Sequence, residues 1–563
     1  MTDASEKSYP WLQSYPPGID WNAHIEPRPA FAMLDDTAAR FPGRPAFNFL
    51  GKKYNWAKIK DLADRMAAGL QQMGVGKGYK IGLFLPNSPY FLISYYAILK
   101  TGATVVNFNP LYADRELKHQ IEDSETDLMI TTDLALLYDK AHVMLHATRL
   151  KSLVICRFTD ILPFPKNVLF RLLKSKDLAR IKHPDQIVWF HDVIDTGATL
   201  QEPMIDPLND IAVLQYTGGT TGIPKGAMLT HHNIYANTMQ SRSWFPAIRD
   251  GVDKMLGVLP FFHVFAMTAV MNISVMTGME IIALPRFDLK DTLKTIHKNK
   301  PTLFPAVPAI YNAINNCTVL DKFNLSSLRF CISGGAPLPV EVKRKFESIT
   351  GCVLIEGYGL SESSPVACAN PIDGENVAGS IGLPLPQTVI EIVDLQDRHT
   401  IVPNGERGEL CIRGPQVMKG YWKKPQETLD VLKDGRLHTG DVAILDERGY
   451  VYIVDRIKDM IITNGYNVYP RNVEEAIYQH PAIEECIVAG LPDDQRGEMV
   501  KAWVKLKADQ KLTAQELKEF LTDRISRMEM PRQVEFRDEP LPKTLIGKLS
   551  RKDIVAQELA KKA

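Results

Sequence analysis

The chain lacks the features that mark membrane-spanning, secreted and nucleic-acid-binding proteins. No run of residues approaches the roughly eighteen consecutive apolar side chains that a bilayer-spanning helix needs. The first residues hold no apolar core of the kind found in a secretory signal. Lysine plus arginine number 66, as do aspartate plus glutamate, so the formal net charge is zero. This balance gives a nucleic-acid interface no electrostatic support.

Cysteine is also scarce. The 7 cysteines are scattered and never form a Cys-x-x-Cys pair. An odd, scattered set favours a reducing compartment and argues against a disulfide framework or a zinc site. The final Lys-Lys-Ala matches no peroxisomal or retention signal. We therefore expect a cytoplasmic protein, and a length of 563 residues predicts several structural modules.

Strand and helix patterns alternate from about residue 79. Apolar runs at 80–86 and 103–108 are typical of strands, and 90–100 between them is typical of a helix. This alternation predicts an α/β fold with parallel sheets covered by helices. After about residue 380 the segments become shorter and β-rich, with Gly and Pro turns.

Three parts follow from these patterns. We expect a large N-terminal domain of stacked, mainly parallel αβ sheets plus a β subdomain at 1–455. A hinge at 456–460 would join it to a small, mobile α+β C-terminal domain at 461–563. Thr513 and Glu516 form a capping-box signature for a helix in that second domain.

The run 216–226, Tyr-Thr-Gly-Gly-Thr-Thr-Gly-Ile-Pro-Lys-Gly, follows a strand-like stretch and is the most informative in the chain. It holds four glycines, three threonines and a lysine, and no acid. Glycines let the backbone come close to a ligand, and bare N–H groups, hydroxyls and a lysine suit a polyphosphate. The spacing is neither that of a P-loop NTPase nor that of a dinucleotide-binding fold.

Further strings agree with this run and lie in a fixed order along the chain. They are Leu-Pro-Phe-Phe-His at 259–263, Glu-Gly-Tyr-Gly-Leu-Ser-Glu at 356–362, His-Thr-Gly-Asp at 438–441, Asp-Arg at 455–456 and Pro-Lys-Thr-Leu-Ile-Gly-Lys at 542–548. Together they resemble the adenylate-forming superfamily: acyl- and aryl-CoA synthetases, firefly-type luciferases and peptide-synthetase adenylation domains. The strings at 106–112, 414–421 and 458–469 are most similar to bacterial long-chain fatty acyl-CoA synthetases.

The resemblance implies a reaction in which a carboxylate and ATP give an acyl-adenylate and pyrophosphate, after which the thiol of CoA takes the acyl group. ATP and CoA would be co-substrates, and Mg²⁺ the metal. Because a carboxylate and a triphosphate repel each other, the enzyme must hold both and absorb negative charge at the α-phosphate.

The resemblance also assigns the nucleotide site. ATP would contact Thr217, Gly218, Gly219, Thr220, Thr221, Gly222, Lys225, Gly335, Ala336, Pro337, Glu356, Gly357, Tyr358, Gly359, Ser361, Glu362, Asp441, Ile453, Arg456 and Lys548. Tyr358 would stack on adenine, and Asp441 would accept hydrogen bonds from the ribose hydroxyls. Glu362, helped by Thr217, would bind Mg²⁺. Taken alone, Glu362 is equally a first-turn helix acid, and Asp441 with Arg456 a structural ion pair.

Lys548, Thr217, Glu362 and His263 are the catalytic candidates that the resemblance gives. Lys548 would bridge the carboxylate and the α-phosphate, although on its own it would be taken for a solvated surface lysine. His263 follows two phenylalanines at the end of a predicted strand, where an isolated histidine is usually a core residue. An acyl pocket would comprise Phe262, His263, Phe265, Ala266, Met267, Gly334 and Gly357.

The small domain must move if Lys548 leaves to admit the thiol, and a hinge rotation achieves this. Lys458 matches the hinge position of the acyl-CoA branch, and Gly465 with Tyr466 would line the path of CoA.

One segment, 161–182, combines apolar residues with six basic ones and, after Asp160, a single acid, Asp177. An apolar face beside a basic face is typical of a helix at an anionic membrane surface. An ordinary core-facing helix with a solvated basic side is the alternative. A peripheral position on the cytoplasmic face of the membrane, and a homodimer, are further expectations.

The sequence thus predicts an ATP-dependent, AMP-forming long-chain fatty acid–CoA ligase. A medium-chain or aryl acid substrate, or a carrier protein as acceptor, is the nearest alternative. A non-catalytic, membrane-associated lipid-binding regulator is the alternative of another class, against which Lys225, Glu362 and Asp441 argue.

Overall fold

The computed structural model describes residues 9–181, 186–217, 224–464, 466–493, 495–544 and 549–561. Several predicted site residues lie outside these ranges: Gly218, Gly219, Thr220, Thr221, Gly222, Gly465 and Lys548. Lys182, the last residue of the basic segment, also lies outside them.

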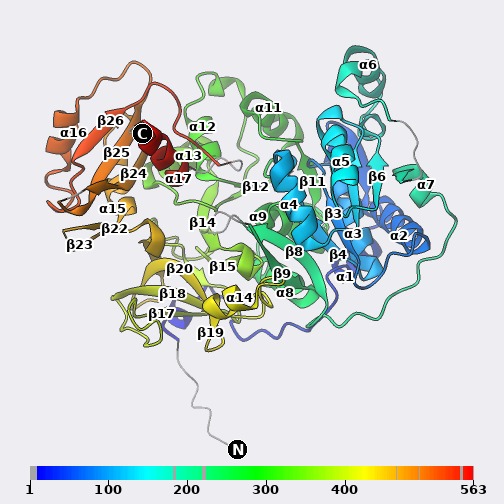
Figure 1. The fold of residues 1–563 in the computed structure, drawn as a ribbon, viewed down its shortest axis with the longest axis horizontal. Helices are drawn as coiled ribbons and strands as arrows, with labels where there is room; N and C mark the ends of the chain where they lie inside the picture. Colours follow the sequence, from blue (N-terminus) through cyan, green and yellow to red (C-terminus); the bar gives the residue numbers. More distant parts are fainter. Residues whose placement is uncertain are drawn as a thin grey trace, which may run out of the picture.

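Two large sheets form the greater part of the molecule (Figure 1). The nine-stranded sheet has the order β16 (Leu383–Pro384), β15 (Val366–Ala369), β14 (Val353–Gly359), β13 (Phe330–Ser333), β12 (Leu303–Ala306), β10 (Lys254–Gly257), β11 (Glu280–Ala283), β1 (Pro45–Phe49), β2 (Lys52–Asn55). The seven-stranded sheet has the order β7 (Ile187–Trp189), β6 (Ser152–Cys156), β5 (Leu128–Thr132), β3 (Lys80–Leu83), β4 (Thr104–Asn107), β8 (Ile211–Thr217), β9 (Lys225–Thr230).

Pairing in both sheets is parallel except at their ends, where β1–β2, β14–β15, β15–β16 and β8–β9 are antiparallel. The α-helices of this part are α1 (Ala32–Arg40), α2 (Trp56–Gln72), α3 (Pro89–Thr101), α4 (Asp114–Ser124), α5 (Ala135–Ala147), α6 (Lys166–Leu173), α7 (Phe190–Ile194), α8 (His231–Trp244), α9 (Val264–Ala266), α10 (Ile273–Thr277), α11 (Leu289–Asn299), α12 (Pro308–Asn315) and α13 (Val340–Thr350). A π-helix, Met267–Asn272, joins α9 to α10. One continuous apolar core runs through both sheets and α3, every residue of which is buried.

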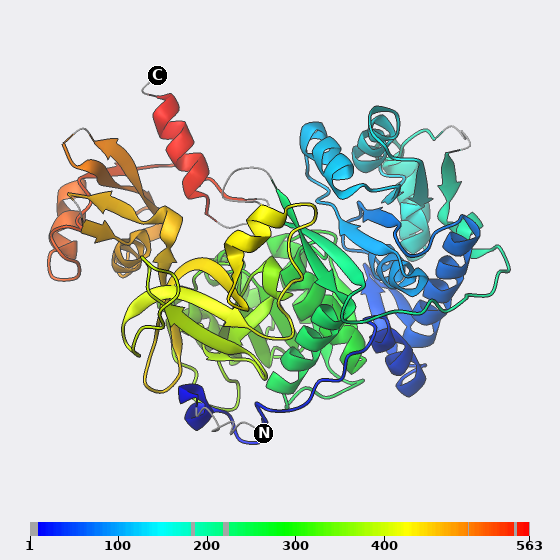
Figure 2. The same ribbon diagram turned by 60° about the horizontal axis from the view of Figure 1, so that its bottom comes forward.

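The β subdomain and the C-terminal domain follow. The first contains β17 (Val389–Val393), β18 (Arg407–Arg413), β19 (Leu432–Lys433), β20 (Arg436–Leu445), β21 (Val451–Arg456) and α14 (Pro425–Val431). The second contains β22 (Ile461–Thr463), β23 (Tyr466–Val468), β24 (Ile483–Asp493), β25 (Gly497–Leu506), β26 (Gln533–Phe536), α15 (Pro470–Tyr478), α16 (Ala514–Leu521) and α17 (Arg551–Ala560). Its apolar clusters are its own. Figure 2 shows it beside the β subdomain and far from α6.

The predicted α/β class and two-domain organisation are confirmed. Strands expected at 80–86 and 103–108 are β3 and β4, the helix expected at 90–100 is α3, and the capping box on Thr513 and Glu516 begins α16. All 7 cysteines are free thiols. Among the described residues, no helix has both the length and the apolar character to cross a bilayer.

Two local expectations are wrong. Within 161–181 the only α-helix is α6, and a 3₁₀ turn follows it at Ser175–Asp177. The α-helix does not extend back to residue 161, because Ile161 and Leu162 are buried in the main core and end the preceding 3₁₀ turn there. His263 does not end a strand, because β10 stops at Gly257 and a turn carries the chain to α9.

Candidate active site

A hairpin places two predicted phosphate ligands opposite each other. Thr217 ends β8 and Lys225 begins β9, and the two residues are paired across the antiparallel ladder. A side chain at Gly226 would come within 3.0 Å of the Tyr216 ring, so glycine is needed for that close approach. The Tyr216 hydroxyl donates to Asp123 Oδ2 at 2.6 Å, which anchors this end of β8. Thr217 and Lys225 therefore lie opposite each other, one at the end of β8 and the other at the start of β9.

Tyr421 connects Lys225 to Glu362. The segment before α14 pairs with β9: the Trp422 N–H donates to the Gly226 carbonyl and the Met228 N–H to the Gly420 carbonyl, each at 2.8 Å. This pairing lays the Tyr421 ring beneath Lys225, whose Nζ is 5.3 Å from the ring centroid.

The Tyr421 hydroxyl donates to Glu362 Oε1 at 2.7 Å. Burial raises the pKa of Tyr421, and the Glu362 charge adds to the rise, so the hydroxyl keeps its proton and remains a donor. Sequence reasoning gave Tyr421 no role. Its only signal was its place in the family-like string 414–421.

Glu362 has the right chemistry for Mg²⁺. It lies in a short 3₁₀ turn, Ser361–Ser363, and is half-buried. Oε1 accepts from Tyr421, whereas no described residue donates to Oε2. One carboxylate oxygen without a described donor, on a residue that Tyr421 links to Lys225, suits a cation that keeps water and phosphate as its other ligands. The donor set therefore fits the predicted metal.

Asp441 lies at the centre of a second polar cluster. Its Oδ2 accepts from the Tyr358 hydroxyl at 2.6 Å, and its Oδ1 pairs with Arg456 Nε at 3.1 Å. Asp441 and Arg456 are register partners on β20 and β21. The Asp441 charge raises the pKa of Arg456, with smaller contributions from Tyr358 and Glu362. The predicted ribose, adenine and metal residues thus act on one another electrostatically, and the ion pair left open above is present.

The loop after β13 and the strand β14 contain many of the predicted ATP-binding residues. Gly335 has φ +78°, a left-handed conformation that favours glycine. Glu356 lies on β14 beside this loop and accepts weakly from the Leu338 N–H at 3.5 Å. Burial raises the pKa of Glu356 to about 7, and the Arg471 charge opposes the rise. A side chain at Gly359 would collide with the Pro365 carbonyl at 1.9 Å.

A small apolar pocket is lined both by the loop after β13 and by predicted acyl residues. It is lined by Leu259, Pro260, His263, Phe265, Ala266, Val307 and Gly335. A side chain at Gly334 would come within 3.1 Å of the Phe265 ring, so that glycine lets the ring pack closely against the residue that follows β13. His263 Nδ1 accepts from the Phe265 N–H at 3.3 Å and caps α9.

The other predicted residues are placed as follows. Phe262 and Met267 do not line the pocket: the Phe262 carbonyl accepts from Gln215 at 3.0 Å, and Met267 is buried in the core. Gly357 and Ile453 are half-buried on β14 and β21, Ser361 is half-buried beside Glu362, and Ala336 and Pro337 follow Gly335 at the surface of the loop.

The predicted hinge lies between β21 and β22. Lys458 is in the 3₁₀ turn Ile457–Asp459. Arg551, at the start of α17, reaches back to this turn and pairs with Asp455 Oδ1 at 3.4 Å and Asp459 Oδ2 at 3.2 Å. Tyr466, on β23, is exposed beyond the turn.

The fold and these clusters define a two-domain α/β protein of the adenylate-forming type. The chain belongs to the AMP-binding enzyme family: residues 34–422 match the model of the AMP-binding enzyme, and 472–548 match that of the AMP-binding enzyme C-terminal domain.

Known proteins resemble the chain over nearly its whole length. A long-chain-fatty-acid–CoA ligase of Bacillus subtilis (strain 168) is 48% identical over 98% of each chain. One of Escherichia coli O157:H7 is 36% identical over 97% of each. The crystal structure of ATP-bound MatB from Rhodopseudomonas palustris is 27% identical, with a TM-score of 0.81 over 94% of this chain and 99% of that one.

Proposed function

We propose that this chain is an ATP-dependent, AMP-forming long-chain fatty acid–CoA ligase. The observation that carries the proposal is the apolar pocket, because its lining joins predicted acyl residues, His263, Phe265 and Ala266, to Gly335 of the predicted nucleotide loop. The carboxyl end of an acid bound there would lie next to Gly335 of the predicted nucleotide loop. The full-length similarity to two relatives named long-chain-fatty-acid–CoA ligases supports the acyl class.

The first half-reaction needs two anions in contact. Lys225 and the hydroxyl of Thr217 bind the β- and γ-phosphates, and Asp441 accepts from the ribose hydroxyls. Lys548 bridges the carboxylate and the α-phosphate, where a positive charge offsets the repulsion. Mg²⁺ held by Glu362, with Thr217 assisting, would neutralise charge on the phosphates. His263 orients the carboxylate at the mouth of the acyl pocket.

The second half-reaction needs a rotated C-terminal domain. We place the hinge at 456–460, with Lys458 as the residue whose backbone turns, between domains at 1–455 and 461–563. After Lys548 has left, CoA enters along Gly465 and Tyr466, and its thiolate attacks the acyl carbonyl and expels AMP. The separate apolar clusters of the C-terminal domain support a rigid-body motion.

A substrate series tests the acyl class. The purified chain is assayed with ATP, Mg²⁺, CoA and straight-chain acids from hexanoate to stearate, with 4-coumarate as the aryl competitor. We expect the highest kcat/KM for a long-chain acid. A preference for hexanoate or coumarate would transfer the proposal to the medium-chain or aryl class. Absence of pyrophosphate release with every acid would favour the lipid-binding regulator.

Lys548→Ala tests the catalytic lysine. The variant should lose pyrophosphate release by at least about a hundredfold, the scale of a lost charge stabiliser. It should still convert a synthetic acyl-adenylate and CoA into thioester. The matched control is Lys543→Ala in the same basic loop, which pairs with Glu485 inside the C-terminal domain. Equal pyrophosphate release by wild type and Lys548→Ala would contradict the assignment.

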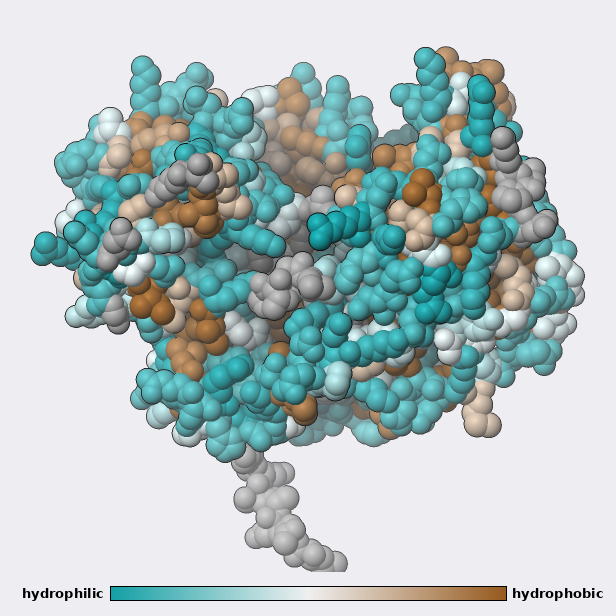
Figure 3. All heavy atoms as spheres, viewed as in Figure 1, coloured by the Kyte–Doolittle hydropathy of each residue, from teal (hydrophilic) through white to brown (hydrophobic). Residues whose placement is uncertain are grey.

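We further propose that α6 holds the protein at the cytoplasmic face of an anionic membrane. Phe164, Leu172 and Leu173 are 82%, 71% and 77% exposed. In Figure 3, brown atoms lie beside teal ones at the upper right, where Figure 1 places α6. Lys174 and Lys176 flank these apolar side chains, a combination that attracts acidic lipid. A homodimer stays a prediction.

Vesicle flotation tests this contact. The wild type should float with phosphatidylglycerol vesicles and less with phosphatidylcholine vesicles. Lys174→Glu/Lys176→Glu should reduce flotation several-fold, since each basic residue contributes about 1 kcal/mol near an anionic surface. Lys290→Glu/Lys294→Glu on α11, whose apolar face is buried, is the charge-matched control. Equal flotation of both variants with wild type would contradict the proposal.

A further inference from the structure

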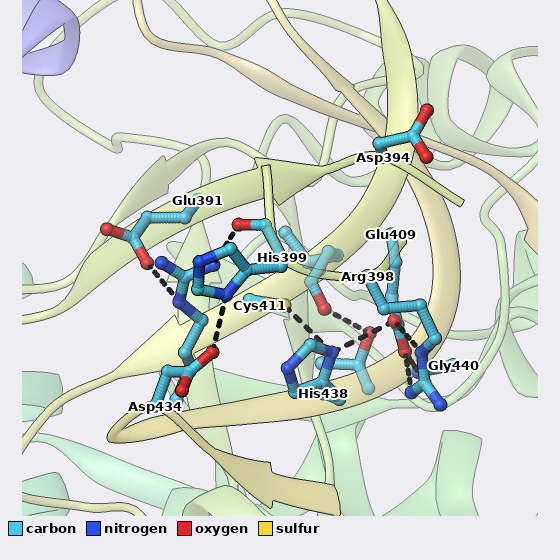
Figure 4. A network of polar contacts seen from close by, with 12 residues as sticks. Glu391, Asp394, Arg398, His399, Glu409, Cys411, Asp434, His438 and Gly440 are labelled. Carbon is cyan, nitrogen blue, oxygen red and sulfur yellow. Dashed lines mark hydrogen bonds and ion pairs between the residues drawn. The ribbon is translucent and has the colours of Figure 1, made fainter. Parts of the chain in front are cut away.

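A wholly buried carboxylate, that of Glu409, lies in a network of polar contacts in the β subdomain (Figure 4). Glu409, on β18, accepts two bonds from Arg398: Nε to Oε2 at 2.7 Å and Nη2 to Oε1 at 2.9 Å. His438 Nδ1 lies 2.9 Å from Oε2. The two side chains of Glu409 and His438 are 0% exposed. A buried charge of this kind is retained only where its partners are complete.

The strand opposite Glu409 contains a bulge. Glu409 is the register partner of Val442, and Cys411 that of His438. Leu410, between the first pair and the second, therefore faces Thr439, Gly440 and Asp441 together. Bulges re-aim side chains and are common beside active sites. Here the bulge ends at Asp441 and turns its carboxylate towards Tyr358 and Arg456.

Three hydrogen bonds fix the bulge. Glu409 Oε1 accepts from the Gly440 N–H at 3.1 Å. The Thr439 hydroxyl donates to the Leu410 carbonyl at 2.8 Å and accepts from the Asp441 N–H at 3.1 Å. Gly440 has φ +72°, and a side chain there would meet nothing within 4 Å, so its backbone conformation, not space, requires glycine.

The same residues have the composition of a metal site, but their bonds do not suit one. Glu409, Cys411 and His438 bring ligand atoms within 4.8 Å of one another. The Arg398 guanidinium already neutralises the carboxylate, and a dication there would face that positive charge. The Cys411 thiol is buried next to Glu409, which raises its pKa to about 12, whereas a metal needs the thiolate.

We propose that Glu409 is a positioning residue for ribose recognition. It fixes the Gly440 N–H, and through the bulge it aims the Asp441 carboxylate at the ribose hydroxyls of ATP. Glu409 itself touches no substrate. This inference rests on the proposed function, in which Asp441 accepts from the ribose.

The preference of the enzyme for ATP over 2′-deoxy-ATP tests this role of Glu409. The ratio of kcat/KM for ATP to that for 2′-deoxy-ATP measures the bond from the 2′-hydroxyl to Asp441. We expect wild type to prefer ATP by at least about tenfold, the scale of one hydrogen bond to a charged group. Glu409→Gln keeps an oxygen but loses the clamp of Arg398, so the preference should fall about tenfold, towards unity.

Glu391→Gln is the matched control. Glu391, on β17 of the same sheet, pairs with Arg413 at 3.1 Å and Arg436 at 3.0 Å, and its side chain makes no hydrogen bond or ion pair with the described residues Thr439, Gly440 and Asp441. Its loss removes a comparable double ion pair, so any general weakening of the sheet appears in both variants. The ATP preference should be unchanged in Glu391→Gln.

A second pair of variants avoids the buried charge. Thr439→Val removes both bonds of the hydroxyl and should lower the ATP preference in the same direction as Glu409→Gln. Thr439→Ser retains the hydroxyl and should restore the preference. This pair decides the matter if Glu409→Gln does not fold.

The outcomes separate the inference from the function on which it rests. If wild type releases pyrophosphate but does not distinguish the two nucleotides, Asp441 does not read the 2′-hydroxyl and the inference fails while the ligase function stands; if no acid gives pyrophosphate release, the proposed function fails. If Asp441→Asn abolishes the preference while Glu409→Gln and Thr439→Val lower both rates equally, the inference alone is overturned. One equivalent of zinc in the purified protein that is lost in Cys411→Ser would also overturn it.

Discussion

Asp441 and Asp455 are both buried on adjacent, paired strands, yet they are held in opposite ways. The partners of Asp441, Tyr358 and Arg456, come from β14 and β21 of the large domain and its edge. Asp455 accepts from the neighbouring Arg456 N–H at 2.8 Å, and its other partners come from the C-terminal domain: the Arg471 N–H at 2.7 Å and Arg551 at 3.4 Å.

The difference follows from what each carboxylate must do. Under the proposed function the nucleotide would stay in place through both half-reactions, and Asp441 would then need partners that do not move with the C-terminal domain. Asp455 lies next to the predicted hinge, and its partners leave if that domain turns. Arg551 pairs with Glu474 at 2.6 Å as well as with Asp455 and Asp459, so one cation holds three acids across the joint. Ionic contacts suit such a joint because water can replace them.

The largest expected effect concerns Asp441, the carboxylate whose partners lie outside the C-terminal domain. Asp441→Asn removes the negative charge that receives the ribose hydroxyls, and kcat/KM for ATP should fall about a hundredfold, as for two bonds to a charged group. The acyl-adenylate carries the same ribose, so thioester formation from a synthetic acyl-adenylate should fall by a similar factor.

Pyrophosphate release and thioester formation are measured separately for this variant. Asp446→Asn, in the turn that joins β20 to β21, is the control and should retain both activities. A loss confined to one half-reaction would show that Asp441 is not a constant ribose acceptor.

A smaller effect is expected for Arg551, which pairs with acids next to the predicted hinge. Arg551→Gln frees Asp455, Asp459 and Glu474 from their shared cation, so the C-terminal domain should detach more often from the hinge. Trypsin should then cut after Arg456 or Lys458 about tenfold faster, since losing a part-buried ion pair costs about 1–3 kcal/mol.

Cleavage is followed by mass spectrometry of the fragments. Arg537→Gln is the control, because Arg537 bonds Glu535 and Gln557 inside the C-terminal domain. Unchanged cleavage in Arg551→Gln, or an equal rise in Arg537→Gln, would mean that Arg551 does not restrain the hinge.

The sequence predicted well what depends on local pattern. The parallel strands β3, β4 and β5 are mostly apolar and almost wholly buried, as expected of strands covered on both faces. The hairpin of Thr217 and Lys225, and the pairing of Asp441 with Arg456, agree with motifs that resemblance supplied. These residues could be singled out because each motif is contiguous in the chain, and their roles stay predictions.

What the sequence did not reveal depends on contacts between distant segments. Tyr421 reaches Glu362 only because residues before α14 add to β9, a pairing without a periodic signal. The bulge at Gly440 arises from a register shift between β18 and β20, and Glu409 supports it from another strand. Ile161 and Leu162 look like part of an amphipathic helix, but the core of the large domain buries them.

The smallest expected effect concerns Glu356, an acid of the fixed domain that faces Arg471 of the movable one. Burial raises its pKa from 4.5 to about 7, so the folded protein binds its proton more tightly than the unfolded chain does. Below pH 4.5 the group is protonated in both states and does not lower the free energy of unfolding. As the pH rises from 4.5 to about 7, the free energy of unfolding falls, by roughly 3 kcal/mol at most. Glu356→Gln removes this penalty.

We expect Glu356→Gln to melt a few degrees above wild type at pH 8, with the difference shrinking as the pH falls through 7 and vanishing near 4.5. Glu341→Gln, an exposed acid on α13, should show no pH-dependent difference. A difference that grew towards acid would mean that Arg471 outweighs burial and holds Glu356 ionised. In that case Glu356 and Arg471 would form an ion pair between the large domain and the C-terminal domain. This ion pair would be a second electrostatic contact between the domains, in addition to the contacts of Arg551.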